Sequence, residues 1–288
     1  MSQGPLVPSY RPGLKPILYS SGFSFLEGPS FDNEGNLFVC EGRSGFVWKI
    51  RPDRTTSRFA CTGGAPIGSK FHSNGHLFVT DCFKHAILDV SPQGMASVYV
   101  DRYDDAEFGC PNDLVFDEAG NLYFTDSGSW SPEPGSRSGR VFRVTSNRDL
   151  SIVATGLAFA NGIALSEDES RLFVAETITK RILSIDLQKK GRPEMLAQMH
   201  GGVGPDGMAL GTDGNLYVAH VGKGVIAVID PEGRTVAEVP AGGMDPTNLA
   251  FNGTSLFVTE AETGSVQRLD IGVRGIPLFG QRIRTSDG

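Results

Sequence analysis

Four polar residues that could hold a metal ion share one place in a repeated sequence pattern. Glu27, Asn112, Asn161 and Asp206 each stand ten or eleven residues before a leucine that recurs along the chain. Carboxylate and amide oxygens suit a hard cation such as Ca²⁺, whereas zinc sites usually contain Cys or His, which this set lacks. We therefore predict a site for one divalent cation, with Ca²⁺ as the expected ion and other divalent ions as alternatives. Taken singly, Asn-Gly and Asp-Gly pairs are also ordinary turn sequences.

The recurring leucine belongs to a phrase that occurs six times. Each copy follows a turn sequence and is rich in aromatic and β-branched residues, as in Gly35–Glu41 and Gly120–Asp126. Such a phrase is typical of a β-strand. The six leucines are Leu37, Leu77, Leu122, Leu172, Leu216 and Leu256.

Each repeat contains further segments that favour strands. An apolar segment such as 114–116 precedes the phrase, an alternating one such as 141–144 follows it, and in most repeats a fourth strand such as 151–154 comes next. Four strands in each unit of 40 to 50 residues indicate a propeller blade. The sequence thus predicts one all-β domain over residues 1–288, a six-bladed β-propeller with blades centred near the six leucines. A β-sandwich is the alternative, and six in-phase copies argue against it.

The last repeat lacks a convincing fourth strand after Leu269. The segment Leu14–Tyr19 precedes the first repeat and has strand character. We expect this N-terminal strand to complete the last blade, because closing the ring removes an exposed sheet edge. The tail 272–288 is expected to form a surface strap or to be partly loose.

Composition narrows the possible functions. The chain has 37 Gly and 17 Pro, which fits many short strands and turns, and its net charge of −7 argues against a nucleic-acid partner. No apolar run is long enough for a membrane span, and the N-terminus lacks the pattern of a signal peptide. The four cysteines form no CxxC pair, so we expect reduced thiols and a cytoplasmic protein. The sequence does not specify an oligomeric state.

The inner strands of a propeller line its central channel, so the four candidate ligands should converge there. The equivalent positions in the second and sixth repeats hold Ile67 and Thr247. Two carboxylates nearly neutralise a divalent ion, and a substrate oxygen or water could still join it. The sequence predicts a cation site open to chemistry at one end of the channel.

Four motifs that carry these residues resemble the gluconolactonase, senescence-marker-protein-30 and regucalcin family of calcium-dependent hydrolases. They are Leu26–Pro29, Pro111–Asp117, Ala160–Ile163 and Gly204–Met208, and the resemblance covers about residues 14–270. It implies that Glu27, Asn161 and Asp206 bind the metal, that Asn112 binds metal, substrate or both, and that Asp206 transfers a proton. Many sugar-lactone members carry an arginine where this chain has Cys110. Cys110 is therefore a candidate substrate contact, and its place in the motif makes a smaller or more apolar lactone as reasonable a substrate as a sugar lactone.

Other candidate substrate contacts lie at the same end of the propeller. Each repeat phrase ends in a residue that begins the next loop there, and we expect a minority of these residues to contact substrate and most to be solvated surface. Within this set Asp126 and His220 are candidate substrate contacts, and His220 could also act as an acid or base. Trp130 lies in the long loop Ser127–Arg140, a possible lid or a tolerated insertion. The six end residues are Glu41, Asp81, Asp126, Glu176, His220 and Glu260.

These features predict a metal-dependent hydrolase that opens a small lactone, of a sugar or otherwise. The cation would polarise the carbonyl oxygen while a water attacks and Asp206 or a nearby group accepts its proton. One alternative is a phosphotriesterase or fluorophosphatase on the same ring of ligands, in which a carboxylate could act as nucleophile. Another is a non-catalytic propeller that binds a ligand at its mouth. A small lactone or ester is the expected partner, with no nucleic acid and no membrane.

Overall fold

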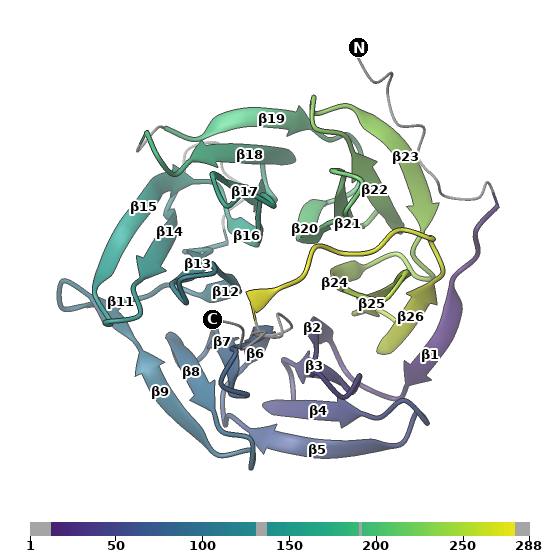
Figure 1. Ribbon diagram of the computed structural model, residues 1–288, viewed down its shortest axis with the longest axis horizontal. Coiled ribbons are helices and arrows are strands. Elements are labelled where there is room, and N and C mark those ends of the chain that lie inside the picture. The colour runs from purple at the N-terminus through teal and green to yellow at the C-terminus, as the bar shows by residue number, and fades with distance from the viewer. Residues whose placement is uncertain (1–12, 131–136, 190–191, 280–288) are drawn as a thin grey trace, which may run out of the picture.

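Six four-stranded antiparallel sheets are arranged as blades around a central axis (Figure 1). The computed structural model describes residues 13–130, 137–189 and 192–279, which include one further two-stranded sheet. The six-bladed propeller predicted from the repeats is confirmed. In this described part of the chain there is no long apolar helix that could cross a membrane.

Each blade runs outward from the axis, and its strands follow chain order in blades 1 to 5. The inner strands are β2 (Leu26–Phe31), β6 (Pro66–Phe71), β12 (Pro111–Phe116), β16 (Ala160–Leu165), β20 (Gly204–Leu210) and β24 (Pro246–Asn252). The second strands are β3 (Leu37–Glu41), β7 (Leu77–Asp81), β13 (Leu122–Asp126), β17 (Arg171–Glu176), β21 (Leu216–Val221) and β25 (Ser255–Glu260).

The outer half of each blade is more exposed. The third strands are β4 (Phe46–Ile50), β8 (Ala86–Val90), β14 (Gly139–Val144), β18 (Arg181–Asp186), β22 (Val225–Ile229) and β26 (Ser265–Leu269). The outermost strands are β5 (Thr56–Cys61), β9 (Ala96–Val100), β15 (Leu150–Leu157), β19 (Glu194–Gln198), β23 (Thr235–Pro240) and β1 (Ile17–Ser21).

The hydrophobic core lies between neighbouring blades. The six repeat leucines are all at most 2% exposed, and core clusters combine strands of adjacent sheets, as where Val258 of blade 6 packs with Val228 of blade 5. The inner and second strands are buried almost throughout, because both faces of these strands are covered by neighbouring blades. This tight packing fixes the inner strands and hence whatever side chains they present to the axis.

The N-terminal strand closes the ring as the sequence predicted. β1 pairs antiparallel with β26, with Ile17 opposite Arg268 and Leu18 opposite Gln267. The strand begins at Ile17 instead of Leu14, directly after Pro16, whose ring cannot donate to the ladder. The first and last parts of the propeller therefore share one sheet.

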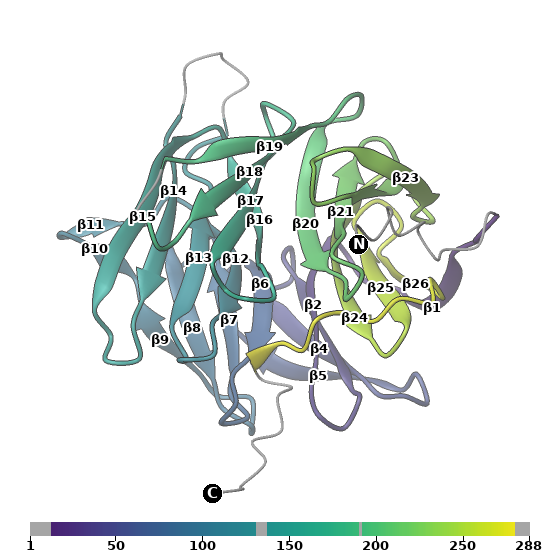
Figure 2. The ribbon, with the colours of Figure 1, turned by 45° about the horizontal axis from the view of Figure 1, so that its top comes forward.

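Two features lie outside the repeat pattern. The short strands β10 (Arg102–Tyr103) and β11 (Ala106–Glu107) form a hairpin between blades 2 and 3 that the repeats did not predict. Residues 272–279, the described part of the predicted tail, form a strap across the channel (Figure 2). Ile276 N donates to Leu210 O at 3.1 Å, and Phe279 packs against Phe116 at the end of β12. Residues 280–288 lie outside the described part.

Candidate functional site at the ring face

The four predicted ligands lie at matching places on four inner strands. Glu27 is in β2, Asn112 in β12, Asn161 in β16 and Asp206 in β20, and these strands surround the axis (Figure 1). All four are at most 9% exposed. We call the face where the inner strands begin the ring face, and the opposite face, crossed by residues 272–279, the strap face.

A β-bulge at the ring position interrupts every inner strand. In β2, Glu27 pairs with Cys40 and the next paired residue is Ser30 with Phe38, which leaves one extra residue on the inner strand. The other five blades show the same shift at the equivalent place. Because a bulge releases side chains from the ladder and re-aims them, the ring residues are free to turn toward the axis.

Buried negative charge accumulates at this ring. Burial, followed by repulsion from Asp206 and Asp113, raises the pKa of Glu27 well above its usual range. Burial and then Asp113 likewise raise the pKa of Asp206, with the Asn161 amide beside it acting in the opposite direction. Carboxylates that are buried together in this way are stabilised in their charged form by a cation.

The Asn161 amide has an oxygen that the protein leaves unsatisfied. Its Nδ2 donates to Thr177 Oγ1 at 3.2 Å, while its buried Oδ1 has no hydrogen-bond partner among the described residues. A buried amide oxygen in this state loses its interaction with water and gains nothing in return, unless a ligand binds it.

The donor set fits a hard cation and depends on its amide oxygens. No group of three or more His, Cys, Asp or Glu side chains arranged for a metal occurs in residues 13–130, 137–189 and 192–279. The ring supplies two carboxylates, Glu27 and Asp206, and two amides, Asn112 and Asn161. This composition agrees with the oxygen ligands that Ca²⁺ prefers.

The residues that end the repeat phrases have a different role from the one expected. All six are at most 6% exposed, so the expectation that most are solvated surface is wrong. In each acidic blade, the carboxylate accepts hydrogen bonds from backbone N–H groups of the loop before the inner strand. It thereby holds the loop that leads to the ring position of its own blade. In blade 3, Asp126 Oδ1 accepts from Cys110 N at 2.7 Å and Oδ2 from Gly109 N at 3.0 Å. In blade 4, Glu176 accepts from Ala158 N at 2.7 Å.

This arrangement recurs in the other acidic blades. Glu41 accepts from Ser24 N at 2.6 Å, Asp81 from Ala65 N at 2.8 Å and Glu260 from Asp245 N at 2.7 Å. Hydrogen bonds to an ionised acceptor are stronger than neutral ones, so each carboxylate fixes the start of its inner strand. Sequence reasoning missed this role, although an acidic residue at one place in five of six repeats was a usable signal. Substrate contact by Asp126 stays a prediction.

His220 replaces the acid in blade 5. Its Nε2 lies 3.1 Å from Gly201 O, in the loop before Asp206, so it takes the same anchoring place. Burial lowers the pKa of His220, which favours the neutral imidazole, and its buried Nδ1 has no partner among the described residues. Its proposed contact with substrate stays a prediction.

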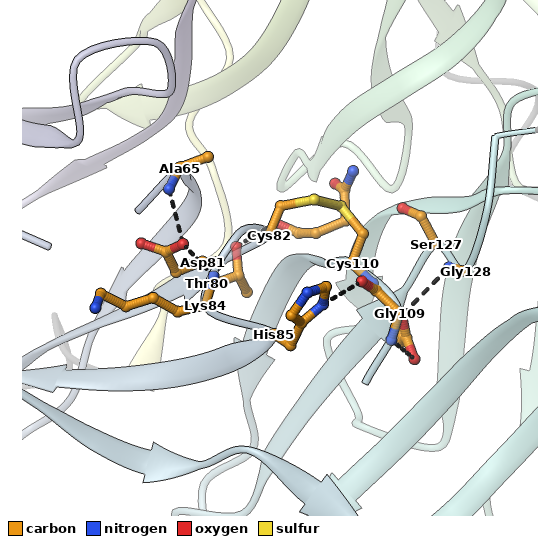
Figure 3. Close-up of a disulfide and its surroundings, with 12 residues drawn as sticks. Ala65, Thr80, Asp81, Cys82, Lys84, His85, Gly109, Cys110, Ser127 and Gly128 are labelled. Atoms are coloured by element: carbon orange, nitrogen blue, oxygen red, sulfur yellow. Dashed lines mark hydrogen bonds between the residues drawn. A yellow bond between two sulfur atoms is a disulfide. The ribbon is translucent and has the colours of Figure 1, made fainter. Parts of the chain in front are cut away.

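A disulfide joins Cys82 and Cys110, so the expectation of four reduced thiols is wrong (Figure 3). The two cysteines are 28 residues apart in sequence, and the propeller brings them together because the loop after β7 lies beside the start of β12. His85 Nδ1 lies 2.7 Å from Gly109 O in the same contact between blades. Cys40, which is buried, and Cys61, which is exposed, remain free. We expected a cytoplasmic location because we expected reduced thiols, and the disulfide removes that argument. The cytoplasmic location itself stays a prediction.

Trp130 lies beside the loop that leads into Asn161. Its ring packs edge to face on Phe159 with 4.8 Å between centroids, and the side chain is 55% exposed. Phe159 stands two residues before Asn161. The rest of the predicted lid, residues 131–136, lies outside the described part.

Four of the exposed large apolar side chains belong to loops of the ring face. Besides Trp130, these are Phe83 in the loop after β7, Val203 in the loop before Asp206, and Met244 in the loop before Thr247. Phe83 is the most exposed, at 75%. Large apolar groups on a surface are common singly, and these four belong to loops of four different blades on one face.

Comparisons with known proteins agree with this architecture. The sequence model of the family described as SMP-30/Gluconolactonase/LRE-like region matches residues 25–262. A protein of Staphylococcus saprophyticus named lactonase drp35 is 34% identical over 248 residues, which cover 81% of this chain and 75% of the relative.

Solved structures show the same fold at lower identity. A gluconolactonase of Xanthomonas campestris aligns with a TM-score of 0.79 and 21% identity over 91% of each chain. A calcium-binding protein of Agrobacterium tumefaciens, regucalcin, aligns with a TM-score of 0.80 and 18% identity, and covers 94% of this chain and 98% of its own.

Proposed function

Because the chain belongs to the SMP-30/gluconolactonase/LRE-like family, we propose that it is a lactonase that binds one divalent cation, Ca²⁺, in the ring of Glu27, Asn112, Asn161 and Asp206. The observation that carries the proposal is the unsatisfied Oδ1 of Asn161 beside two buried carboxylates. The oxygen ligands fit the cation, and the relative named lactonase drp35 supports the reaction.

The ring residues have separate tasks in this proposal. A bound divalent cation would polarise the carbonyl group of the lactone and stabilise the negative charge that develops on its oxygen. Glu27 and Asn161 would hold the ion, and Asn112 would contribute an amide oxygen to the ion, the substrate or both. The bulges and the loop-anchoring carboxylates keep these side chains in place before substrate arrives, which lowers the reorganisation needed during the reaction.

Asp206 is the proposed proton acceptor. As water adds to the carbonyl carbon, one carboxylate oxygen of Asp206 takes the proton of the water. The ester C–O bond of the ring then breaks, and Asp206 returns the proton to the departing ring oxygen, which leaves a hydroxy acid. Coordination would lower the basicity of a carboxylate, so this role would need an oxygen of Asp206 that remains available for the proton.

The ring face favours a lactone with an apolar substituent over a sugar lactone. The position at which many sugar-lactone members carry an arginine holds Cys110, whose sulfur is bonded to Cys82 and presents no charge or strong donor. The exposed side chains of Phe83, Trp130, Val203 and Met244 add apolar surface at the same face. Hydroxyl groups of a sugar would lose water against such surfaces without gaining hydrogen bonds.

A hydrolysis panel with and without EDTA tests the proposal. We expect alkyl- and aryl-substituted γ- and δ-lactones to be opened faster than glucono-δ-lactone, activity to be lost in EDTA, and Ca²⁺ to restore it. Glu27→Gln should abolish the restoration. Glu34→Gln, which alters an exposed carboxylate in the same blade, is the matched control and should behave as the unmodified protein. Activity on paraoxon-like phosphotriesters but on no lactone would replace the proposal by the phosphotriesterase alternative, and the absence of both activities by the ligand-binding alternative.

A further inference from the structure

A second layer of residues lies directly beneath the ring. The residue after each ring position is glycine in four blades, and is Asp113 in blade 3 and Asn248 in blade 6. The glycines are required for space. A Cβ on Gly207 would lie 2.1 Å from the Asn248 side chain, and one on Gly68 would lie 2.5 Å from Asn112 O. The six residues are Gly28, Gly68, Asp113, Gly162, Gly207 and Asn248.

Asp113 and Asn248 meet across the channel. Their strands, β12 and β24, lie on opposite sides of the axis (Figure 1). Asn248 Nδ2 nevertheless donates to Asp113 Oδ2 at 3.3 Å, because the four glycines leave the width of the channel to these two side chains. Asp113 is fully buried, and its Oδ1 also accepts from Leu114 N at 2.8 Å. The pair therefore forms a floor under the ring.

Lys70 approaches this floor from the strap face. Its Nζ lies 3.6 Å from Asp113 Oδ1, and its side chain is 11% exposed. Lys70 also lines the cavity that Phe279 and Leu210 help to enclose beneath the floor. A buried lysine is strongly disfavoured unless a carboxylate neutralises it, so its position depends on Asp113.

We infer that Lys70 is a positioning residue that balances the charge of Asp113 and thereby sets the affinity of the ring for its cation. The inference rests on the proposed cation site. Glu27, Asp113 and Asp206 place three carboxylates in the upper channel. Together with the positive charge of Lys70, these carboxylates leave a net charge of −2, which one divalent ion neutralises. Lys70 also repels the ion, so it weakens binding that three carboxylates alone would make tighter.

The inference predicts the sign of each substitution. Lys70→Met removes the positive charge that faces Asp113 below the ring and should tighten Ca²⁺ binding, on the order of tenfold for a charge that is poorly screened in a buried channel. Asp113→Asn leaves the lysine uncompensated and should weaken binding by a similar factor. The double variant Lys70→Met with Asp113→Asn removes a neutral pair, so its affinity should return to within about threefold of the unmodified protein.

Calorimetric titration of Ca²⁺ into the full, EDTA-stripped chain measures these affinities. Lys70→Arg keeps the charge and should restore the original affinity, which a loss of packing alone would not explain. Lys49→Met is the matched control, since Lys49 pairs with Asp32 at a partly exposed position in blade 1, and it should change nothing.

Four outcomes separate this inference from the proposed function. Tighter binding by Lys70→Met with reversal in the double variant supports it. Weaker or unchanged binding by Lys70→Met, in a protein that binds Ca²⁺, overturns the inference and leaves the lactonase proposal intact. No Ca²⁺ binding by the unmodified protein overturns the cation site and this inference together. If Lys70→Met does not fold, the test compares the Ca²⁺ affinities of Asp113→Asn and the double variant. The inference requires Asp113→Asn to bind Ca²⁺ about tenfold more weakly, and equal affinities refute it.

Discussion

Loss of the disulfide between Cys82 and Cys110 should destabilise the propeller by an amount that follows from the size of the loop it closes. The cysteines are separated by 28 residues. Restricting a loop of that length in the unfolded chain stabilises the folded state by about 3.6 kcal/mol at 25 °C. With roughly 2.1 cal/mol/K of unfolding entropy per residue over 288 residues, the melting temperature should fall by about 6 °C.

The double variant Cys82→Ala with Cys110→Ala is the cleanest perturbation, and urea unfolding of both proteins is the assay. Cys61→Ser is the matched control, because Cys61 is an exposed free thiol and its loss should leave stability unchanged. Thiol counting gives independent support. Burial raises the pKa of the Cys40 thiol, so one thiol should react in the folded protein and two after denaturation without reductant.

Two results would refute this reasoning. Four reactive thiols in the denatured, unreduced protein would show that the two cysteines are not bonded. A stability difference below about 1 kcal/mol with the bond present would show that the unfolded chain is already restricted in this region. If the variant loses more lactonase activity than folded protein, the disulfide also helps to position Asn112, which stands two residues after Cys110.

Three further predictions concern the site and its supports. Asp206→Asn should abolish lactone hydrolysis, and undiminished turnover with metal bound would contradict its role as proton acceptor. Arg140→Gln leaves buried Asp126 without its ion pair at 2.7 Å and should cost about 2 kcal/mol in urea unfolding, discounted because Arg140 is partly exposed. Arg102→Gln, which removes an exposed pair with Asp101, is the control and should leave the free energy of unfolding unchanged. Burial raises the pKa of Tyr123 to about 12. The stability that Tyr123 contributes is therefore complete below pH 10, and on the order of 2 to 3 kcal/mol of it is lost as the pH rises through 12. Tyr123→Phe should remove this loss, and an identical pH profile of stability in that variant would contradict it.

Much of the fold was predictable because the repeats record it directly. The leucine phrase recurs once per blade, since every blade needs the same buried second strand, and the four ring residues follow from their fixed distance to it. The closing strand was predictable from a missing fourth strand, although Pro16 shifted its start. The hairpin of β10 and β11 was not, because strands of two residues carry no alternating pattern.

The contacts that the sequence did not predict join residues of different blades. Cys82 and Cys110 become neighbours only when blades 2 and 3 pack side by side. No sequence pattern predicts a disulfide between cysteines that are 28 residues apart. Asp113 and Asn248 meet only because four glycines stand at the equivalent positions of the remaining blades. The anchoring acids were misjudged because a carboxylate at a strand end is usually solvated. Here each carboxylate accepts from backbone N–H in the loop before the inner strand of its own blade.

The floor of Asp113 and Asn248, together with the strap at the opposite face, has a kinetic consequence. In the proposed function, the contact of these two side chains blocks passage below the ring, so a lactone would enter and its hydroxy acid would leave from the ring face. The product would carry a new carboxylate, which the proposed divalent ion would attract more strongly than it attracts the neutral lactone. Product inhibition should therefore be competitive and should weaken as ionic strength rises, with release of the acid setting the pace of turnover at high substrate concentration.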